Sequence, residues 1–338
     1  MNYFLERGGI GDLLMRIPYY NALAFCGVPF KLLIPSDKTE FFSLFFKDND
    51  ILPVSQSLLA KSSLYAWWFA HMHHIDKKND MVFVPSSYHD RKLLACAAML
   101  RIPRAAYEGE ACSREADMSG FTVIRNPYRK AGKGVDAHIS RHSDAFFRAF
   151  FEQLPFYEDI YKNYPRIKNY AYAPSGYDMV IMTDAGAEYR RYPQDLWQRF
   201  LDMLPRELRI VQIGLNQMEL SHPGISGLKT RNLRRIFELI ADTPLFVGND
   251  TGFTHWSYFS GNKTVCILGA GDLNRFLPWD SDLFSLKCIH SRNCICSMWN
   301  CSRADLKESV PPCIANIDPH IIYEEYMLMT NIPEPACC

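Results

Sequence analysis

Short apolar runs alternate with longer amphipathic segments along the first half of the chain. The apolar runs are typical of buried or extended strands and lie at 2–6, 30–35, 80–86, 105–109 and 121–128. Between them, apolar residues recur every three or four positions, which predicts helices. These helices are expected at 13–27, 39–48, 57–74, 90–102 and 143–154. Strands that alternate with helices predict a parallel sheet with helices packed on it.

A second alternating series begins after residues 155–177, a segment without clear periodicity that is rich in proline, tyrosine and charge. Its expected strands and helices lie at 178–186, 193–205, 209–214, 232–243, 244–250, 252–261 and 263–269. We therefore expect an α/β protein with two doubly wound domains, at 1–165 and 178–316. The remaining segment, 317–338, is expected to form a helix and tail that pack back on the N-terminal domain.

Composition narrows the class of protein. Lysine plus arginine and aspartate plus glutamate both number 37, and this balance argues against a nucleic-acid-binding protein. The N-terminal residues lack the pattern of a signal peptide, and no apolar run approaches the roughly 20 residues that a membrane helix needs. We expect a cytoplasmic protein, with peripheral contact at the inner face of the membrane as an open alternative. The aromatic residues at 65–74 are interpreted mainly as core packing.

Four polar loops fall at the carboxyl ends of predicted strands, where doubly wound sheets bind their ligands. The first contains Gly8, Gly9, Gly11 and Asp12. Asp12 at a helix start can accept a proton from a substrate or cap the helix. The loop has neither the glycine spacing of a dinucleotide fingerprint nor the lysine of a P-loop.

The second and third loops add charge. Arg190 and Arg191 follow a strand that ends in small residues, and guanidinium groups suit phosphate because they offer a planar fork of donors. The alternative is a solvated pair of arginines. Glu219 follows the next strand, where it can contact a ribose or adenine group or simply face solvent.

The fourth loop opens a helix directly after a buried strand. Thr251 and Gly252 begin this helix, whose N–H groups and positive dipole end attract a diphosphate. Asp250 is expected to fix the loop by accepting hydrogen bonds from backbone N–H groups. His255 can donate to a phosphate or sugar, or serve the core as most single helical histidines do.

Together these segments resemble glycosyltransferase family 9, the heptosyltransferases of lipopolysaccharide assembly. The resemblance follows the order of the family's motifs along nearly the whole chain. The similar segments are GGIGDLLMRIP (8–18), HDRKLLACAAMLRIPRAAYEG (89–109), DAHISRHSDAFF (136–147), DAGAEYRRYPQDLW (184–197) and LFVGNDTGFTHWSYFSGNKTVCILGAGD (245–272). The last of them, with its Asp-Thr-Gly-x-x-His pattern, is the most specific.

The resemblance implies a GT-B architecture, in which two Rossmann-like domains face a central cleft. It also implies an inverting sugar transfer that requires no cofactor or catalytic metal. By position, Asp12 is the general base for the acceptor hydroxyl, and Arg190 matches a family lysine that neutralises the leaving diphosphate. The family's Lys-Arg-Trp-Pro reads Arg-Arg-Tyr-Pro here, so the donor is open; an ADP-sugar, above all ADP-heptose, is the family's best-known choice.

The resemblance also assigns binding residues on both sides of the reaction. The residues implied for the donor are Gly186, Arg190, Glu219, Asp250, Thr251, Gly252 and His255. The residues implied for the acceptor are Gly11, Arg91, His138 and Arg141, and three of them lie in a basic stretch of the N-terminal half. They fit an anionic glycan, a lipid-linked core or a protein acceptor. A solvated loop is the alternative interpretation of the basic stretch.

Five of the eleven cysteines lie within residues 288 to 313. Cys294, Cys296, Cys301 and Cys313 are candidate ligands for structural zinc or iron, although the paired Cys-x-x-Cys spacing is absent. Reduced, unligated thiols are the alternative. Two other functions are also kept open: a nucleotide-sugar epimerase, which would turn over the donor alone, and a catalytically silent nucleotide-sugar-binding subunit.

Overall fold

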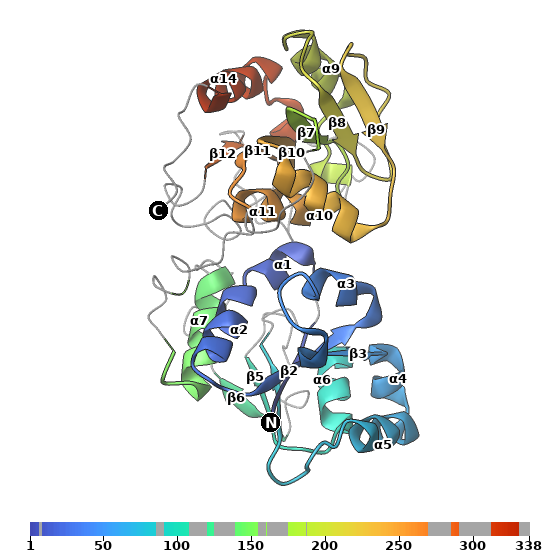
Figure 1. The fold of residues 1–338 in the computed structure, drawn as a ribbon, viewed down its shortest axis with the longest axis vertical. Helices are drawn as coiled ribbons and strands as arrows, with labels where there is room; N and C mark the ends of the chain where they lie inside the picture. Colours follow the sequence, from blue (N-terminus) through green and yellow to red (C-terminus); the bar gives the residue numbers. More distant parts are fainter. Residues whose placement is uncertain are drawn as a thin grey trace. The chain divides into compact units, whose positions relative to one another are not determined.

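The computed structural model describes residues 1–6, 9–85, 91–107, 120–124, 139–154, 160, 175–186, 188–269, 285–290 and 312–330. The chain divides into two compact units, Met1–Tyr164 and Pro165–Cys338. Each unit is an α/β domain built on its own six-stranded sheet (Figure 1).

The first unit has a fully parallel sheet in the order β3-β2-β1-β4-β5-β6. Its strands are β1 (Asn2–Leu5), β2 (Phe30–Pro35), β3 (Ile51–Val54), β4 (Met81–Val84), β5 (Arg104–Tyr107) and β6 (Thr122–Ile124). Its helices are α1 (Ile10–Leu14), α2 (Ile17–Phe25), α3 (Thr39–Phe42), α4 (Gln56–Lys61), α5 (Ser63–Met72), α6 (Arg91–Met99) and α7 (Ile139–Phe150). This strand order is that of a Rossmann-like sheet, in which the chain reverses direction between β1 and β4.

The core of the first unit has two different faces, because successive side chains of a strand point to opposite sides. On one side, Phe4 lies 5.0 Å from Phe83 and 5.5 Å from Phe147 between ring centroids, beneath α2 and α7. On the other side, smaller side chains such as Leu5 and Val84 pack with residues of α4, α5 and α6. Figure 1 shows these two helix groups on either side of the strands.

The second unit repeats the arrangement, with a parallel sheet in the order β12-β11-β10-β7-β8-β9. Its strands are β7 (Met179–Met182), β8 (Ile210–Ile213), β9 (Ile225–Leu228), β10 (Leu245–Asn249), β11 (Lys263–Leu268) and β12 (Leu286–His290). Its helices are α9 (Gln194–Asp202), α10 (Leu233–Asp242), α11 (Gly252–Phe259), α13 (Pro312–Ala315) and α14 (Pro319–Thr330), with a 3-10 turn, η5, at Glu188–Arg190. The chain therefore reverses direction between β7 and β10.

Helix α14 belongs to the core of the second unit. Its buried residues Ile322, Tyr326 and Met329 pack in one cluster with Trp197 of α9 and with strand residues such as Ile267. On the other face of the sheet, Trp256 of α11 contacts α10, because its indole N–H donates to the Phe237 carbonyl at 3.0 Å. The predicted packing of 317–338 on the N-terminal domain stays a prediction.

The predicted fold class, α/β with two Rossmann-like domains, is confirmed by these two sheets. Three strands that the sequence pattern did not predict, β3, β9 and β12, are all at sheet edges.

The single helix expected at 57–74 is two helices, because the Ser62 hydroxyl accepts from the Tyr65 N–H and starts α5. The interpretation of 65–74 as core holds for Phe69 but is wrong for Trp67 and Trp68, whose exposed fractions are 58% and 48%.

The described helices include none with the length and apolar character required to cross a membrane.

Candidate functional site

The strand order indicates where each unit binds a ligand. In an open parallel sheet the crevice lies outside the carboxyl ends of the two strands between which the chain reverses. In the first unit these strands are β1 and β4, and β1 leads into Glu6 and α1. In the second unit they are β7 and β10, which lead into the loop at 183–191 and into α11.

In the first unit, Asp12 lies in the first turn of α1 and is partly buried. Its Oδ2 accepts a hydrogen bond from the Gly9 N–H at 3.2 Å. The carboxylate therefore caps the helix, which is one of the two roles that the sequence predicts for Asp12. The cap fixes the position of the carboxylate. Gly11 precedes it in the same turn and is also partly buried.

A buried ion pair lies next to this loop. Arg16, at the start of α2, donates to the Glu6 carboxylate through Nε at 2.8 and 3.1 Å and through Nη2 at 2.7 Å. The side chains are 2% and 0% exposed. The Tyr20 hydroxyl also donates to Glu6, and the Gln56 amide donates to the Glu6 carbonyl at 2.8 Å.

The negative charge of Glu6 and the positive charge of Arg16 balance each other in this network. Burial alone would lower the pKa of Arg16, but the neighbouring Glu6 carboxylate outweighs it and raises that pKa. Burial and the same carboxylate raise the pKa of Tyr20 well above its usual value. Glu6, Arg16 and Tyr20 are not among the residues predicted from sequence; the available signal was the two charged residues, Glu6 and Arg16, within otherwise apolar segments.

In the second unit, Asn249 connects the two loops at the switch point, which is the position in the sheet where the chain reverses direction. This residue is fully buried at the end of β10, and its side-chain amide donates to the Thr183 carbonyl at 2.8 Å. Its Oδ1 accepts from the Tyr192 N–H at 3.1 Å. One buried side chain thus joins the end of β7, the end of β10 and the segment after Arg190 and Arg191.

Asp250 brings Arg190 and His255 together at the start of α11. Its Oδ2 lies 3.6 Å from Arg190 Nη1, and its Oδ1 lies 3.8 Å from His255 Nε2. Asp250 and His255 are buried, whereas the Arg190 side chain is 22% exposed. The Asp250 contacts that the structure shows are with these two side chains. The contacts with backbone N–H groups expected from sequence stay a prediction. His255 Nδ1 meets the Tyr258 hydroxyl, which anchors the imidazole in its own helix.

Thr251 is the N-cap of α11. Its hydroxyl accepts from the Thr254 N–H at 3.4 Å, and the Thr254 hydroxyl donates to the Asn249 carbonyl at 2.5 Å. Thr251 and Gly252 are both partly exposed. The positive end of the α11 dipole therefore lies at the carboxyl end of β10, beside the arginine that Asp250 holds.

Arg191 differs from Arg190 in its partner. Its Nη2 lies 3.0 Å from Asp184 Oδ1 and donates to the Ala185 carbonyl at 3.3 Å. Asp184 also accepts at 3.2 Å from the backbone and side-chain N–H groups of Asn216. The hydrogen bonds between Asp184 and Asn216 thus link the loops after β7 and β8, and the ion pair with Arg191 joins two parts of the loop after β7.

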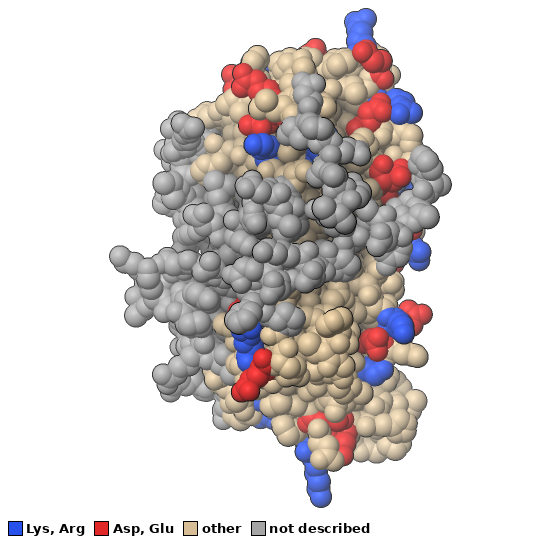
Figure 2. All heavy atoms as spheres, turned by 60° about the vertical axis from the view of Figure 1, so that its left-hand side comes forward, with Lys and Arg blue, Asp and Glu red and all other residues tan. Residues whose placement is uncertain are grey.

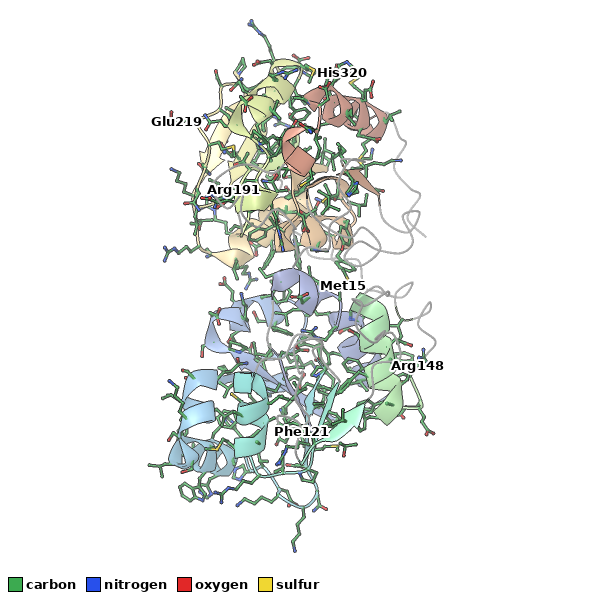
Figure 3. The ribbon with its side chains drawn as sticks, turned by 180° about the vertical axis from the view of Figure 1, so that it is seen from behind. Met15, Phe121, Arg148, Arg191, Glu219 and His320 are labelled. Carbon is green, nitrogen blue, oxygen red and sulfur yellow. The ribbon has the colours of Figure 1, made fainter. Side chains whose placement is uncertain are left out.

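Two of the predicted donor residues lie on the surface. Gly186 is exposed, and the space around its Cα is open. Glu219 is exposed at the margin of the second unit, away from Arg191 (Figure 3). Its carbonyl accepts from the Gln194 amide at 2.9 Å, which fixes its backbone.

Several predicted residues fall outside the described part of the chain. His138, Cys294, Cys296 and Cys301 are among them, and for Arg91 in α6 and Arg141 in α7 only the backbone is described. Cys313 is described and is 2% exposed. Within the described ranges, no group of three or more histidine, cysteine, aspartate or glutamate side chains is placed to hold a metal ion. The proposed cysteine ligand set therefore stays a prediction.

Charges on the molecular surface are mixed. Figure 2 shows basic and acidic side chains interspersed over the described part of the face that it presents. This distribution agrees with the formal net charge of zero.

No protein-family model and no curated protein matches the sequence. Solved structures do match it over almost its whole length. The glycosyl transferase family 9 protein from Veillonella parvula has a TM-score of 0.70 at 12% identity, covering 97% of this chain and 96% of its own.

Two Escherichia coli enzymes are similar to the same extent. Heptosyltransferase WaaC with ADP has a TM-score of 0.69 at 12% identity, covering 97% of this chain and 99% of its own. ADP-heptose lps heptosyltransferase II has a TM-score of 0.66 at 14% identity, covering 97% and 98%. Likeness at this identity establishes architecture, and the chain has the fold of these glycosyltransferases.

Proposed function

We propose that the chain is a glycosyltransferase that takes its sugar from a nucleoside-diphosphate donor. The observation that carries the proposal is the convergence of Arg190, Thr251 and the N-terminus of α11 at the switch point of the second unit. The proposal is supported by a fold shared with heptosyltransferases, of which WaaC has been solved with ADP and with an ADP-heptose analogue.

In this proposal the second unit binds the donor diphosphate. The α11 dipole and the N–H groups of its first turn face the phosphate oxygens, and the Thr251 hydroxyl adds a donor. Arg190, held beside the helix by Asp250, supplies a full positive charge. His255 supports Asp250, while Gly186 leaves room for the ligand and Glu219 contacts the nucleoside. An ADP-sugar, in particular ADP-heptose, is the donor we favour.

The first unit supplies the base. As the acceptor hydroxyl oxygen attacks the anomeric carbon, the bond from that carbon to the phosphate oxygen breaks. The acceptor proton passes to the Asp12 carboxylate, and the electron pair of the broken bond remains on the leaving diphosphate. Because the acceptor attacks the face opposite the leaving diphosphate in one displacement, the anomeric centre is inverted. Arg190 and the α11 N-terminus stabilise the developing charge in place of a catalytic metal.

The acceptor in this proposal is an anionic glycan, such as a lipopolysaccharide core or another lipid-linked acceptor. Gly11 leaves space beside the base, and Arg91, His138 and Arg141 supply positive charge. This assignment is supported by the positions of these residues in segments that resemble the family's motifs, and not by side-chain contacts in the structure.

A thermal-shift panel with ADP, GDP, UDP and CDP tests the donor site. A ligand that binds the native state alone raises the melting temperature, so ADP should stabilise the wild type. Arg190→Ala should lose that shift, whereas Asp12→Ala should keep it while losing sugar transfer. Arg209→Ala is the matched control, because Arg209 pairs with Asp178 at the amino ends of β7 and β8.

The outcomes separate the alternatives. Stabilisation by another nucleotide keeps a transferase and changes the donor, whereas no stabilisation by any nucleotide contradicts the proposal. Turnover of the nucleotide sugar without an acceptor would instead indicate an epimerase.

A further inference from the structure

Helices α4 and α5 carry a concentrated patch of exposed apolar side chains in the first unit. The patch, here called the α4–α5 face, is defined by Leu58, Leu64, Trp67, Trp68 and Met72. Their exposed fractions are 52%, 73%, 58%, 48% and 54%. Leu64, Trp67, Trp68 and Met72 are spaced three or four residues apart on α5, which places them on one side of the helix. Exposed apolar side chains gathered in this way are typical of a binding surface.

Packing of α5 on the core does not account for the apolar side chains of the α4–α5 face. Helix α5 already buries Ala66, Phe69 and Ala70 in the core of the first unit, whereas Leu64, Trp67, Trp68 and Met72 lie outside it. A helix that is apolar on both sides must be covered by protein or by lipid. Trp67 stacks on His71 with ring centroids 5.5 Å apart, and Trp68 lies 5.7 Å from Tyr65, so both indoles have ring neighbours at the surface.

The charges around the face have one dominant sign. Residues 51–75 contain no aspartate or glutamate. Lys61 ends α4, and exposed Lys77 and Lys78 follow α5. Of the nearby acids, Asp80 is buried and pairs with the N-terminal amine at 2.7 Å. Asp76 is exposed and keeps its negative charge, since it accepts from the neutral Lys78 N–H at 2.9 Å, so the three lysines outnumber it. A partner surface should therefore be apolar and negatively charged.

We propose that the α4–α5 face docks on the surface of an anionic lipid membrane. Tryptophan suits the boundary between headgroups and acyl chains, since its ring is apolar and its N–H is polar. The lysines at the ends of the helices reach lipid phosphates, each adding electrostatic attraction. The helices lie along the surface, and their apolar side chains enter it by about 5–10 Å.

This membrane contact is independent of the nucleotide site. It requires no donor, and its residues take no part in the proposed transfer. A transferase that modifies a lipid-linked acceptor gains from it, because the contact holds the enzyme where that acceptor is concentrated.

Co-sedimentation with sucrose-loaded vesicles tests the proposal. One set of vesicles is phosphatidylcholine alone, and the other contains phosphatidylglycerol as well. The wild type should bind the anionic vesicles, more weakly as salt rises. In Trp67→Ser with Trp68→Ser, the partition coefficient should fall about tenfold for each tryptophan lost. Lys77→Gln with Lys78→Gln should lose much of the preference for the anionic vesicles.

The control is Ile321→Ser with Leu328→Ser, which removes two smaller apolar side chains of similar exposed fraction from α14 and should leave vesicle binding unchanged. All variants should keep the wild-type melting temperature and nucleotide shift, so failure of the nucleotide site and failure of membrane docking are distinguishable. Equal vesicle binding by wild type and the tryptophan variant overturns the proposal, as does no binding by the wild type. A dimer in solution that the tryptophan variant dissociates also overturns it, because the face would then join two copies of the chain.

Discussion

The two units share one strand order, but the charged side chains at their switch points are buried in the first unit and partly exposed in the second. In the first unit, Glu6 and Arg16 are buried and neutralise each other beside the loop that carries Asp12. In the second unit, Arg190 and Arg191 form ion pairs while retaining 22% and 32% exposure of their side chains. The first arrangement holds a loop in place, whereas the second keeps positive charge accessible to an anion. The same topology can therefore support a base in one unit and a phosphate site in the other.

Breaking the buried pair should have the largest effect. Arg16→Met leaves the Glu6 carboxylate buried without its cation, and we expect the free energy of unfolding to fall by about 3–5 kcal/mol. Urea denaturation measures this loss. In the double variant Glu6→Leu with Arg16→Met, most of the stability should return, because a packed apolar pair can replace a buried ion pair. A loss below about 1 kcal/mol in Arg16→Met would mean that the pair is not structural.

Removing the accessible charge should weaken binding rather than folding. In Arg190→Ala, we expect ADP affinity to fall by about 1.5–3 kcal/mol, since hydrogen bonds to charged groups have this magnitude. Calorimetric titration measures the affinity. Arg191→Ala should weaken it less, because Arg191 already serves Asp184 and Ala185. Equal losses in the two variants would remove the distinction that we draw between them.

The helix cap of α11 should contribute to both folding and binding. Thr251→Ala removes the oxygen that accepts from the Thr254 N–H, and caps of this type stabilise proteins by about 1 kcal/mol. We expect a loss of that size in thermal or urea unfolding, together with weaker ADP binding. Thr251→Ser restores the hydroxyl and is the control. A variant with serine that behaves like the alanine variant would show that the cap is not the cause.

The smallest expected effect is a change in pH dependence. Burial and then Glu6 raise the pKa of Tyr20 in the folded state, so folding favours the protonated phenol. The resulting stability is present below the usual tyrosine pKa of 10.0, which applies to the unfolded state, and is lost as pH rises above it, because the unfolded state then binds fewer protons. Tyr20→Phe should flatten this alkaline decline in the free energy of unfolding. An unchanged slope would exclude Tyr20 as its source.

The sequence predicted the central strands well because they are buried on both faces and read as continuous apolar runs. It predicted the edge strand β6 but missed the edge strands β3, β9 and β12, which are less constrained: β3 contains Pro53, and β9 contains Gly227 beside Ser226. Apolar periodicity also could not reveal that Trp67 and Trp68 face outward, since a spacing of three or four fits either side of a helix.

The candidate site was predicted in the same uneven way. Four site residues could be predicted because each lies in a loop after a predicted strand, within a segment that resembles the family. They are Asp12, Arg190, Asp250 and Thr251. Pairing is a three-dimensional property, and no local pattern showed that Asp250 contacts Arg190 and His255 or that Glu6 meets Arg16. Asn249 was missed for the same reason, although its hydrogen bonds join both loops of the second unit.

Hydrogen–deuterium exchange with and without ADP tests the central claim most directly, because it locates the nucleotide on the chain. We predict slower exchange in peptides covering 183–193 and 249–255, at the switch point of the second unit, and unchanged exchange in β1 and α2 of the first. Arg190→Ala should lose this protection at the same ADP concentration. Protection confined to other segments, or no protection at saturating ADP, would contradict the assignment of the second unit as the donor site.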